Sequence, residues 1–97
     1  MMNRITMVTY DITNNKLRRK LDKVLCGYGL RMQYSVFRCM LDSLQVANMQ
    51  AQIAKVLTAH EKLLLPTDSV VIIGGLRADN FLFLTPNPCG TGPFLIY

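Results

Sequence analysis

The hydrophobic pattern of this 97-residue chain changes its period four times. Residues 4–10 alternate between apolar and polar side chains, which predicts a β-strand. Residues 16–28 place apolar side chains three or four positions apart, which predicts an amphipathic helix. Residues 30–41 return to alternation, residues 42–56 to a helical stripe, and residues 68–73 to a strand-like apolar run. The predicted order is therefore strand, helix, one or two strands, helix and strand.

Several residues predict where these elements begin and end. Thr13 or Asn14 can cap the first helix. The alternation falters around residues 37–39, so we expect residues 30–41 to form two strands joined by a tight turn or bulge. Asp42 and Gln45, three positions apart, resemble the capping pair of a second helix.

The last third of the chain contains its most apolar segment. Residues 70–73 (VVII) are apolar on both faces, which is typical of a central strand covered on both sides. The glycine pair at 74–75 is expected to end this strand. Residues 81–84 are a candidate further strand, and three prolines interrupt the chain after it. We therefore divide the chain into a domain over residues 1–80 and a C-terminal strand or tail over residues 81–97, which could serve as a dimer arm or dock a partner.

The order of elements predicts an α+β fold. A βαββαβ chain forms one antiparallel sheet with both helices on the same face. Two helices cannot cover the other face, and 51% of the residues are hydrophobic, more than one small core needs. We therefore expect the uncovered face to meet a second copy of the chain.

Positive charge is concentrated in the first part of the chain. Residues 1–38 have a net charge of +6 and residues 39–97 one of −1. This asymmetry favours a surface that faces a polyanion, although a solvated helix that happens to be basic gives the same pattern. The predicted helix provides a ridge that can bind phosphates without reading bases. The predicted nucleic-acid-binding set is Lys16, Arg18, Arg19, Lys20, Lys23 and Arg31.

The sequence lacks the motifs of nucleotide-binding loops, metal sites, signal peptides and membrane helices. No glycine-rich phosphate-binding motif occurs. The three cysteines show no paired spacing, and the single histidine, His60, is predicted to be a surface residue rather than a metal ligand. No signal-peptide pattern opens the sequence and no apolar run approaches the ~20 residues of a membrane helix. We therefore expect a cytoplasmic protein without a membrane partner.

Asp11 ends the first predicted strand, beside the basic helix. A carboxylate in this position can hold a divalent cation, and Mg²⁺ is commonly bound by one or two carboxylates together with water and phosphate oxygens. Two copies of Asp11 brought together by a two-fold axis would make a better site than one. Alternatively, Asp11 is a turn or helix-start residue that favours the positive helix end. The aromatic residues Tyr28, Tyr34 and Phe37 are predicted to be core residues rather than base-stacking platforms.

Four segments together resemble a known family. They are residues 8–12 (VTYDI), 16–20 (KLRRK), 27–31 (GYGLR) and 33–37 (QYSVF). In this order they are similar to the small CRISPR-associated Cas2 proteins, and the match covers residues 4–60.

The resemblance implies a ferredoxin-like homodimer whose C-terminal strand pairs with the partner's sheet. It also implies a role in acquiring new spacers, in which the dimer binds duplex DNA and bridges copies of the CRISPR integrase. Family members are further described as Mg²⁺-dependent endonucleases acting on RNA or DNA, so a stand-alone endoribonuclease or a toxin-like RNase is the alternative function.

The resemblance also assigns residues. Asp11, together with its mate in the other protomer, corresponds to the metal-binding and catalytic aspartate. Tyr10 is assigned to the catalytic set, and Arg18 and Phe37 match further positions near the family's cleft. Arg38 stands where an acidic residue is common, and the segment from Gly74 onward is longer than in the short family form.

Overall fold

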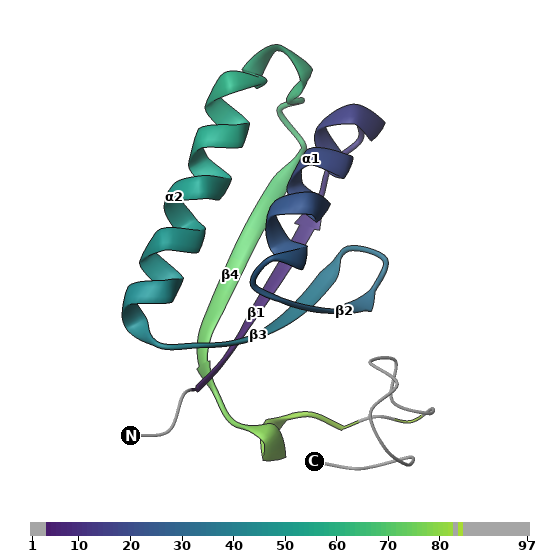
Figure 1. The fold of residues 1–97 in the computed structure, drawn as a ribbon. Helices are drawn as coiled ribbons and strands as arrows, with labels where there is room; N and C mark the ends of the chain where they lie inside the picture. The colour runs from purple at the N-terminus through teal and green to yellow at the C-terminus, as the bar shows by residue number, and fades with distance from the viewer. Residues whose placement is uncertain (1–3, 83, 85–97) are drawn as a thin grey trace.

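The computed structural model describes residues 4–82 and residue 84, and these form one antiparallel sheet with two helices packed on one face (Figure 1). The predicted βαββαβ order and α+β class are confirmed. The elements are β1 (Arg4–Asp11), α1 (Asn15–Cys26), β2 (Gly29–Gln33), β3 (Val36–Leu41), α2 (Ser43–Ala59) and β4 (Ser69–Leu76). Two 3₁₀ turns, Glu61–Leu63 and Ala78–Asn80, flank β4 in the sequence.

The strands lie in the order β2-β3-β1-β4. The prediction that residues 70–73 form a central strand is therefore wrong, because β4 lies at the edge of the sheet. Val70 and Ile72 pack against the core under the helices. Val71 and Ile73 point to the other face and are 47% and 39% exposed. The segment is apolar on both faces although no helix among residues 4–82 covers one of them.

The glycine pair at 74–75 does not end β4, as the sequence analysis had predicted. Met7 of β1 pairs with Ile73, and Ile5 then pairs with Leu76, so β4 holds one more residue than β1 between the two pairs. Gly75 has a φ of +73°, a conformation that favours glycine. The glycines therefore form a bulge that lets pairing continue.

The predicted helix starts are confirmed by their hydrogen bonds. The Asn14 side chain accepts from the backbone N–H of Leu17 at 3.0 Å and so caps α1. At α2 the Asp42 carboxylate accepts from the N–H of Gln45 at 2.8 Å, and the Gln45 side chain accepts from the N–H of Asp42 at 3.0 Å. This reciprocal pair satisfies two amide groups that the helix itself leaves without partners.

The predicted division of residues 30–41 into two strands is confirmed, but its predicted place near residues 37–39 is wrong: the two-residue turn lies at 34–35, and residues 37–39 continue β3. Gly29 begins β2 where a side chain has no room. A Cβ there would lie 2.4 Å from the Arg38 carbonyl oxygen and 2.6 Å from Cys39 Sγ.

Burial raises the pKa of the Cys39 thiol to about 11, so this cysteine stays protonated at neutral pH.

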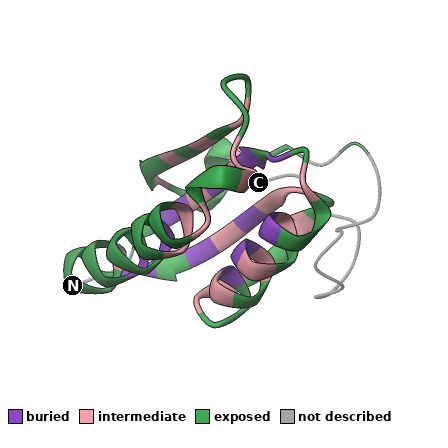
Figure 2. Ribbon diagram, turned by 90° about the horizontal axis from the view of Figure 1, so that it is seen from above, coloured by how far each residue is buried: buried purple, intermediate pink, exposed green. Residues whose placement is uncertain are grey.

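The core lies between the helices and the sheet (Figure 2). Leu17, Leu21 and Leu25 of α1 are fully buried, and Met49 and Ile53 of α2 are buried beside them. The helix-facing side chains of β1 and β3 complete this core. Burying each such side chain stabilises the fold by about 1.5–3 kcal/mol.

No helix of the described chain covers the opposite face of the sheet, called here the open face. Leu30, Met40, Val71 and Ile73 are its most exposed large apolar side chains by the strand register. A groove of about 580 Å³ lies between this face and the segment after β4, lined by Met7, Val36, Ile73, Leu76, Phe81 and Leu82 among others.

The predicted strand at residues 81–84 is described only in part. Leu82 forms an isolated bridge, whereas residue 83 and residues 85–97 lie outside the described residues. No helix among residues 4–82 is both long enough and apolar enough to span a membrane.

Candidate functional site

Asp11 lies at the end of β1, where its backbone pairs with Ser69 at the start of β4. Its side chain is exposed and makes no hydrogen bond or ion pair with any other described residue. The backbone N–H of the preceding residue, Tyr10, donates to the carbonyl of Ser35 at 3.1 Å, which places the β2–β3 turn at the same end of the sheet. Asn14 rather than Asp11 caps α1. With respect to the described residues, the Asp11 carboxylate is therefore available to a cation or substrate.

The chain that follows Asp11 is held from two sides. The Arg18 guanidinium donates to the Ile12 carbonyl at 2.8 Å. The Asp68 carboxylate accepts from the Thr13 N–H at 3.2 Å and from its hydroxyl at 3.0 Å. These contacts join the β1–α1 loop to the segment before β4 and restrict the path of the chain next to Asp11.

Asp68 is a residue that the sequence analysis missed. It accepts a further hydrogen bond from the backbone N–H of Leu65 at 2.9 Å, and this bond, followed by those from Thr13, lowers the pKa of its carboxyl group. Fifty-five positions separate Asp68 from Thr13. No local spacing in the sequence signals a contact between residues so far apart.

Tyr10 lies on the face of the sheet opposite to Asp11, because successive strand residues point to opposite faces. It is 4% exposed, its hydroxyl donates to the Asp22 carboxylate, and its ring stacks on Phe37 with centroids 6.4 Å apart. The structure therefore separates the two side chains predicted to act together. The catalytic assignment of Tyr10 remains a prediction.

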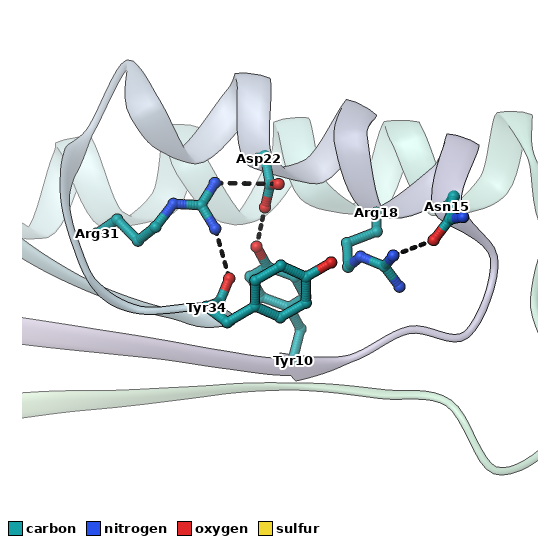
Figure 3. A network of polar contacts seen from close by, with 6 residues as sticks. All are labelled: Tyr10, Asn15, Arg18, Asp22, Arg31 and Tyr34. Carbon is teal, nitrogen blue, oxygen red and sulfur yellow. Dashed lines mark hydrogen bonds and ion pairs between the residues drawn. The ribbon is translucent and has the colours of Figure 1, made fainter.

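A polar network connects β1, α1 and the β2–β3 turn (Figure 3). Asp22 accepts the Tyr10 hydroxyl and forms an ion pair with Arg31 at 3.0 Å. Arg31 donates to the backbone carbonyl of Tyr34. The Arg18 guanidinium lies 5.3 Å from the centroid of the Tyr34 ring and also donates to the side chain of Asn15.

The structure separates the six predicted nucleic-acid-binding residues into two groups. Arg18 and Arg31 belong to the network, where both guanidinium groups bind within the protein. The other four lie at i, i+3, i+4 and i+7 of α1, which places them on one helix face. None of these four forms a hydrogen bond or ion pair with another described residue. We call this set the basic stripe: Lys16, Arg19, Lys20 and Lys23.

The predicted burial of the aromatic residues is correct for two of three. Phe37 is fully buried and Tyr28 packs against the core. Tyr34 is 68% exposed, so its assignment to the core is wrong. It occupies the turn between β2 and β3, where the strand alternation that predicted its burial no longer applies.

The described residues of one chain contain no group of three or more histidine, cysteine, aspartate or glutamate side chains that could hold a metal ion. Asp11 alone supplies one carboxylate. Mg²⁺ keeps several water ligands and commonly takes one or two carboxylates with substrate phosphate oxygens. The donor type at Asp11 suits Mg²⁺, and a second carboxylate from another copy of the chain would bring the number of carboxylates to two.

Comparisons with known proteins agree with this fold. A family model described as "CRISPR associated protein Cas2" matches residues 2–75. A Geobacter sulfurreducens protein named "CRISPR-associated endoribonuclease Cas2" is 36% identical over 79 residues, which cover 81% of this chain and 77% of that protein. A Chloroflexus aurantiacus protein named "CRISPR-associated endoribonuclease Cas2 3" is 39% identical over 56 residues, but the match spans only 60% of its length and 58% of this chain.

Solved structures show the same architecture. Streptococcus pyogenes Cas2 superposes with a TM-score of 0.58 at 26% identity, covering 71% of this chain and 82% of that structure. A hypothetical protein from Thermus thermophilus gives the same TM-score at 30% identity, covering 76% of this chain and 96% of that one.

Proposed function

The chain belongs to the CRISPR-associated Cas2 family, and on that premise we propose that it acts in spacer acquisition as a homodimer that binds duplex DNA and bridges copies of the CRISPR integrase. The basic stripe is the observation that carries this proposal. Four cationic side chains that have no hydrogen-bond or ion-pair partner among the described residues lie on one face of α1. Such a row attracts the phosphate backbone without selecting a base sequence.

The open face supports the dimer. Met40 is 61% exposed and Leu30 50%, and Val71 and Ile73 extend the apolar surface to the other edge. A second copy covering this face would remove these side chains from water, at about 25 cal/mol per Å² of apolar area. We propose that residues 81–97 form the arm that completes the dimer or docks the integrase.

Duplex binding can be tested with two charge-matched variants. Arg19→Gln with Lys23→Gln removes two charges from the basic stripe, and Lys55→Gln with Lys62→Gln removes two from elsewhere. For each contacting protomer, the stripe variant should reduce the slope of log affinity against log salt by about 1.8. Its affinity at 0.15 M salt should fall by roughly 10- to 30-fold, since each lost phosphate contact costs about 1 kcal/mol there. Fluorescence anisotropy with a 30-base-pair duplex measures both quantities.

The control variant should bind within about twofold of wild type. Equal losses of duplex affinity in the two variants would mean that only the total charge matters, and the basic stripe would not be the binding surface. A dimer that binds the duplex without any salt dependence would contradict the proposal as well.

A second function, Mg²⁺-dependent endoribonuclease activity, is favoured by Asp11. Its carboxylate is exposed, has no partner among the described residues and lies at a sheet end that two loops converge on. We propose that Asp11 of each protomer in the dimer holds the cation. A bound Mg²⁺ would activate water and stabilise charge on the phosphodiester. Tyr10 is proposed to contribute by holding Asp22 and α1 in place, since its hydroxyl is engaged there.

Nuclease activity is tested by comparing wild type with Asp11→Asn on RNA and duplex DNA, in Mg²⁺ and in EDTA. Cleavage should occur only with wild type in Mg²⁺, and duplex binding by the variant should stay within about twofold of wild type. Equal cleavage by both proteins would show that Asp11 is not the metal-binding residue. No cleavage by either would leave the duplex-binding function alone.

A further inference from the structure

Tyr34 is exposed in a way that its neighbours do not explain. It is the one mostly exposed aromatic side chain among the described residues, with 68% of its surface accessible. It occupies a two-residue turn, where small polar residues and glycine are the usual choice. The Tyr34 ring is not part of the buried core.

The backbone of Tyr34 is nevertheless held firmly. Its carbonyl accepts from the Arg31 guanidinium, and Arg31 is anchored by its ion pair with Asp22 at 3.0 Å. Asp22 is in turn fixed by the hydroxyl of the buried Tyr10. The turn is therefore tied to the core by charged hydrogen bonds (Figure 3), which are stronger than bonds between neutral groups.

The ring itself is oriented by a cation. The Arg18 guanidinium lies 5.3 Å from the ring centroid, within the range of a cation–π contact. Arg18 is held by the carbonyl of Ile12 at 2.8 Å and by the side chain of Asn15. An aromatic ring whose position is set before a ligand arrives loses little entropy on binding.

Tyr34 lies near two features of the proposed function. Arg19 of the basic stripe follows Arg18 along α1 and lies about 100° further round the helix. The Ser35 carbonyl bonds to the N–H of Tyr10, which precedes Asp11, so the turn also lies at the Asp11 end of the sheet.

We infer that Tyr34 is a stacking site for an unpaired nucleobase of a strand whose phosphates run along the basic stripe. This inference rests on the proposed nucleic-acid binding and adds a ligand class to it, namely single-stranded segments. Bases stack on aromatic rings with about 1–3 kcal/mol each, independently of sequence. Bases inside a duplex already stack on each other and cannot use the site.

Two substitutions separate stacking from other roles of the side chain. Tyr34→Phe keeps the ring, and Tyr34→Leu keeps an apolar side chain without a ring. The probes are a 12-nucleotide single-stranded RNA with a central 2-aminopurine and a 30-base-pair blunt duplex. Tyr34→Leu should weaken single-strand binding by about 5- to 100-fold and abolish the quenching of 2-aminopurine fluorescence. Duplex binding should change less than twofold, and Tyr34→Phe should match wild type in every measurement.

Each result decides between the inference and its premise. If Tyr34→Leu binds the single-stranded RNA and quenches its 2-aminopurine fluorescence as wild type does, the stacking inference is wrong, whereas the duplex-binding proposal is unaffected. Equal losses of affinity for the single strand and the duplex would also overturn the stacking inference, because they would indicate that the substitution disturbs the binding surface in general. If wild type binds the single strand but not the duplex, the proposed duplex function fails and the stacking site survives. If wild type binds neither probe, both proposals fail.

Discussion

Helices α1 and α2 lie on the same face of the sheet and each turns one side to solvent, but only α1 is strongly charged. Five cationic side chains occur in the 12 residues of α1, whereas α2 has Lys55 alone in 17 residues. Their inner sides are alike, since leucine in α1 and Met49 and Ile53 in α2 fill one continuous core.

This difference shows what the fold requires and what it does not. Both helices need an apolar inner side, because the sheet must be covered. Neither needs several positive charges on its outer side, since α2 packs with Lys55 alone. The charge on α1 is therefore an addition to the fold, and exposed like charges on neighbouring turns even repel each other slightly. The proposed polyanionic partner would account for this charge, and the following changes test the comparison.

The largest effect on stability is expected from substitutions on the inner sides of α1 and α2, and the two helices should respond alike. Leu21→Ala in α1 and Met49→Ala in α2 each leave a cavity in a fully buried site and should reduce the free energy of unfolding by about 2–5 kcal/mol. Urea denaturation at one fixed protein concentration measures both. Lys23→Ala on the exposed side should change stability by no more than about 0.5 kcal/mol. A near-zero effect of either core change would show that its helix is not part of the common core.

A smaller effect is expected where α1 contacts the β2–β3 turn, for which α2 has no counterpart. Asp22→Ala leaves the buried Tyr10 hydroxyl and the Arg31 guanidinium without their shared acceptor. Stability should fall by about 1–3 kcal/mol. The matched change Gln52→Ala on the exposed side of α2 should be close to neutral in the same thermal melts. Equal effects of the two substitutions would mean that the network contributes nothing specific to α1.

The smallest effect is expected at Asp68, which joins the segment after α2 to the loop before α1. Hydrogen bonds from Leu65 and Thr13 lower its pKa in the folded protein, so its charged form is favoured by folding. This stabilisation is present above the ordinary aspartate pKa of about 3.9 and is lost as the pH falls through the lowered folded value. Asp68→Asn should therefore melt below wild type at pH 7, and the difference should vanish in strong acid. A difference independent of pH would show that the charge is not involved.

Local patterns were sufficient for most of the fold. The spacing of Leu17, Leu21 and Leu25 predicted the buried side of α1, and Asp42 with Gln45 predicted the capping box of α2. These predictions succeeded because each depends on residues within one or two helical turns. The predicted end of β4 at the glycines failed because a glycine pair suits a bulge as well as a turn, and only the pairing partner decides between them.

The candidate site was predicted less completely. Asp11 was found from its place at the end of a strand and from the family resemblance. The sequence analysis grouped Arg18 with the basic stripe, but the tertiary structure turns it toward Tyr34 and the carbonyl of Ile12. It also missed Asp68, since nothing near that residue in the sequence indicates Thr13 as its partner.

The sequence by itself determined the order of the elements, the apolar sides of the helices and the concentration of charge on α1. Each of these follows from periodicity within a short segment, where hydrophobic burial selects one side of a helix or strand. Only the tertiary structure decided that β4 lies at the sheet edge, that Asp68 meets Thr13, and that Tyr34 is exposed beside Arg18. These outcomes depend on which distant segments meet, and hydrophobic burial, being non-directional, does not specify that in a local pattern.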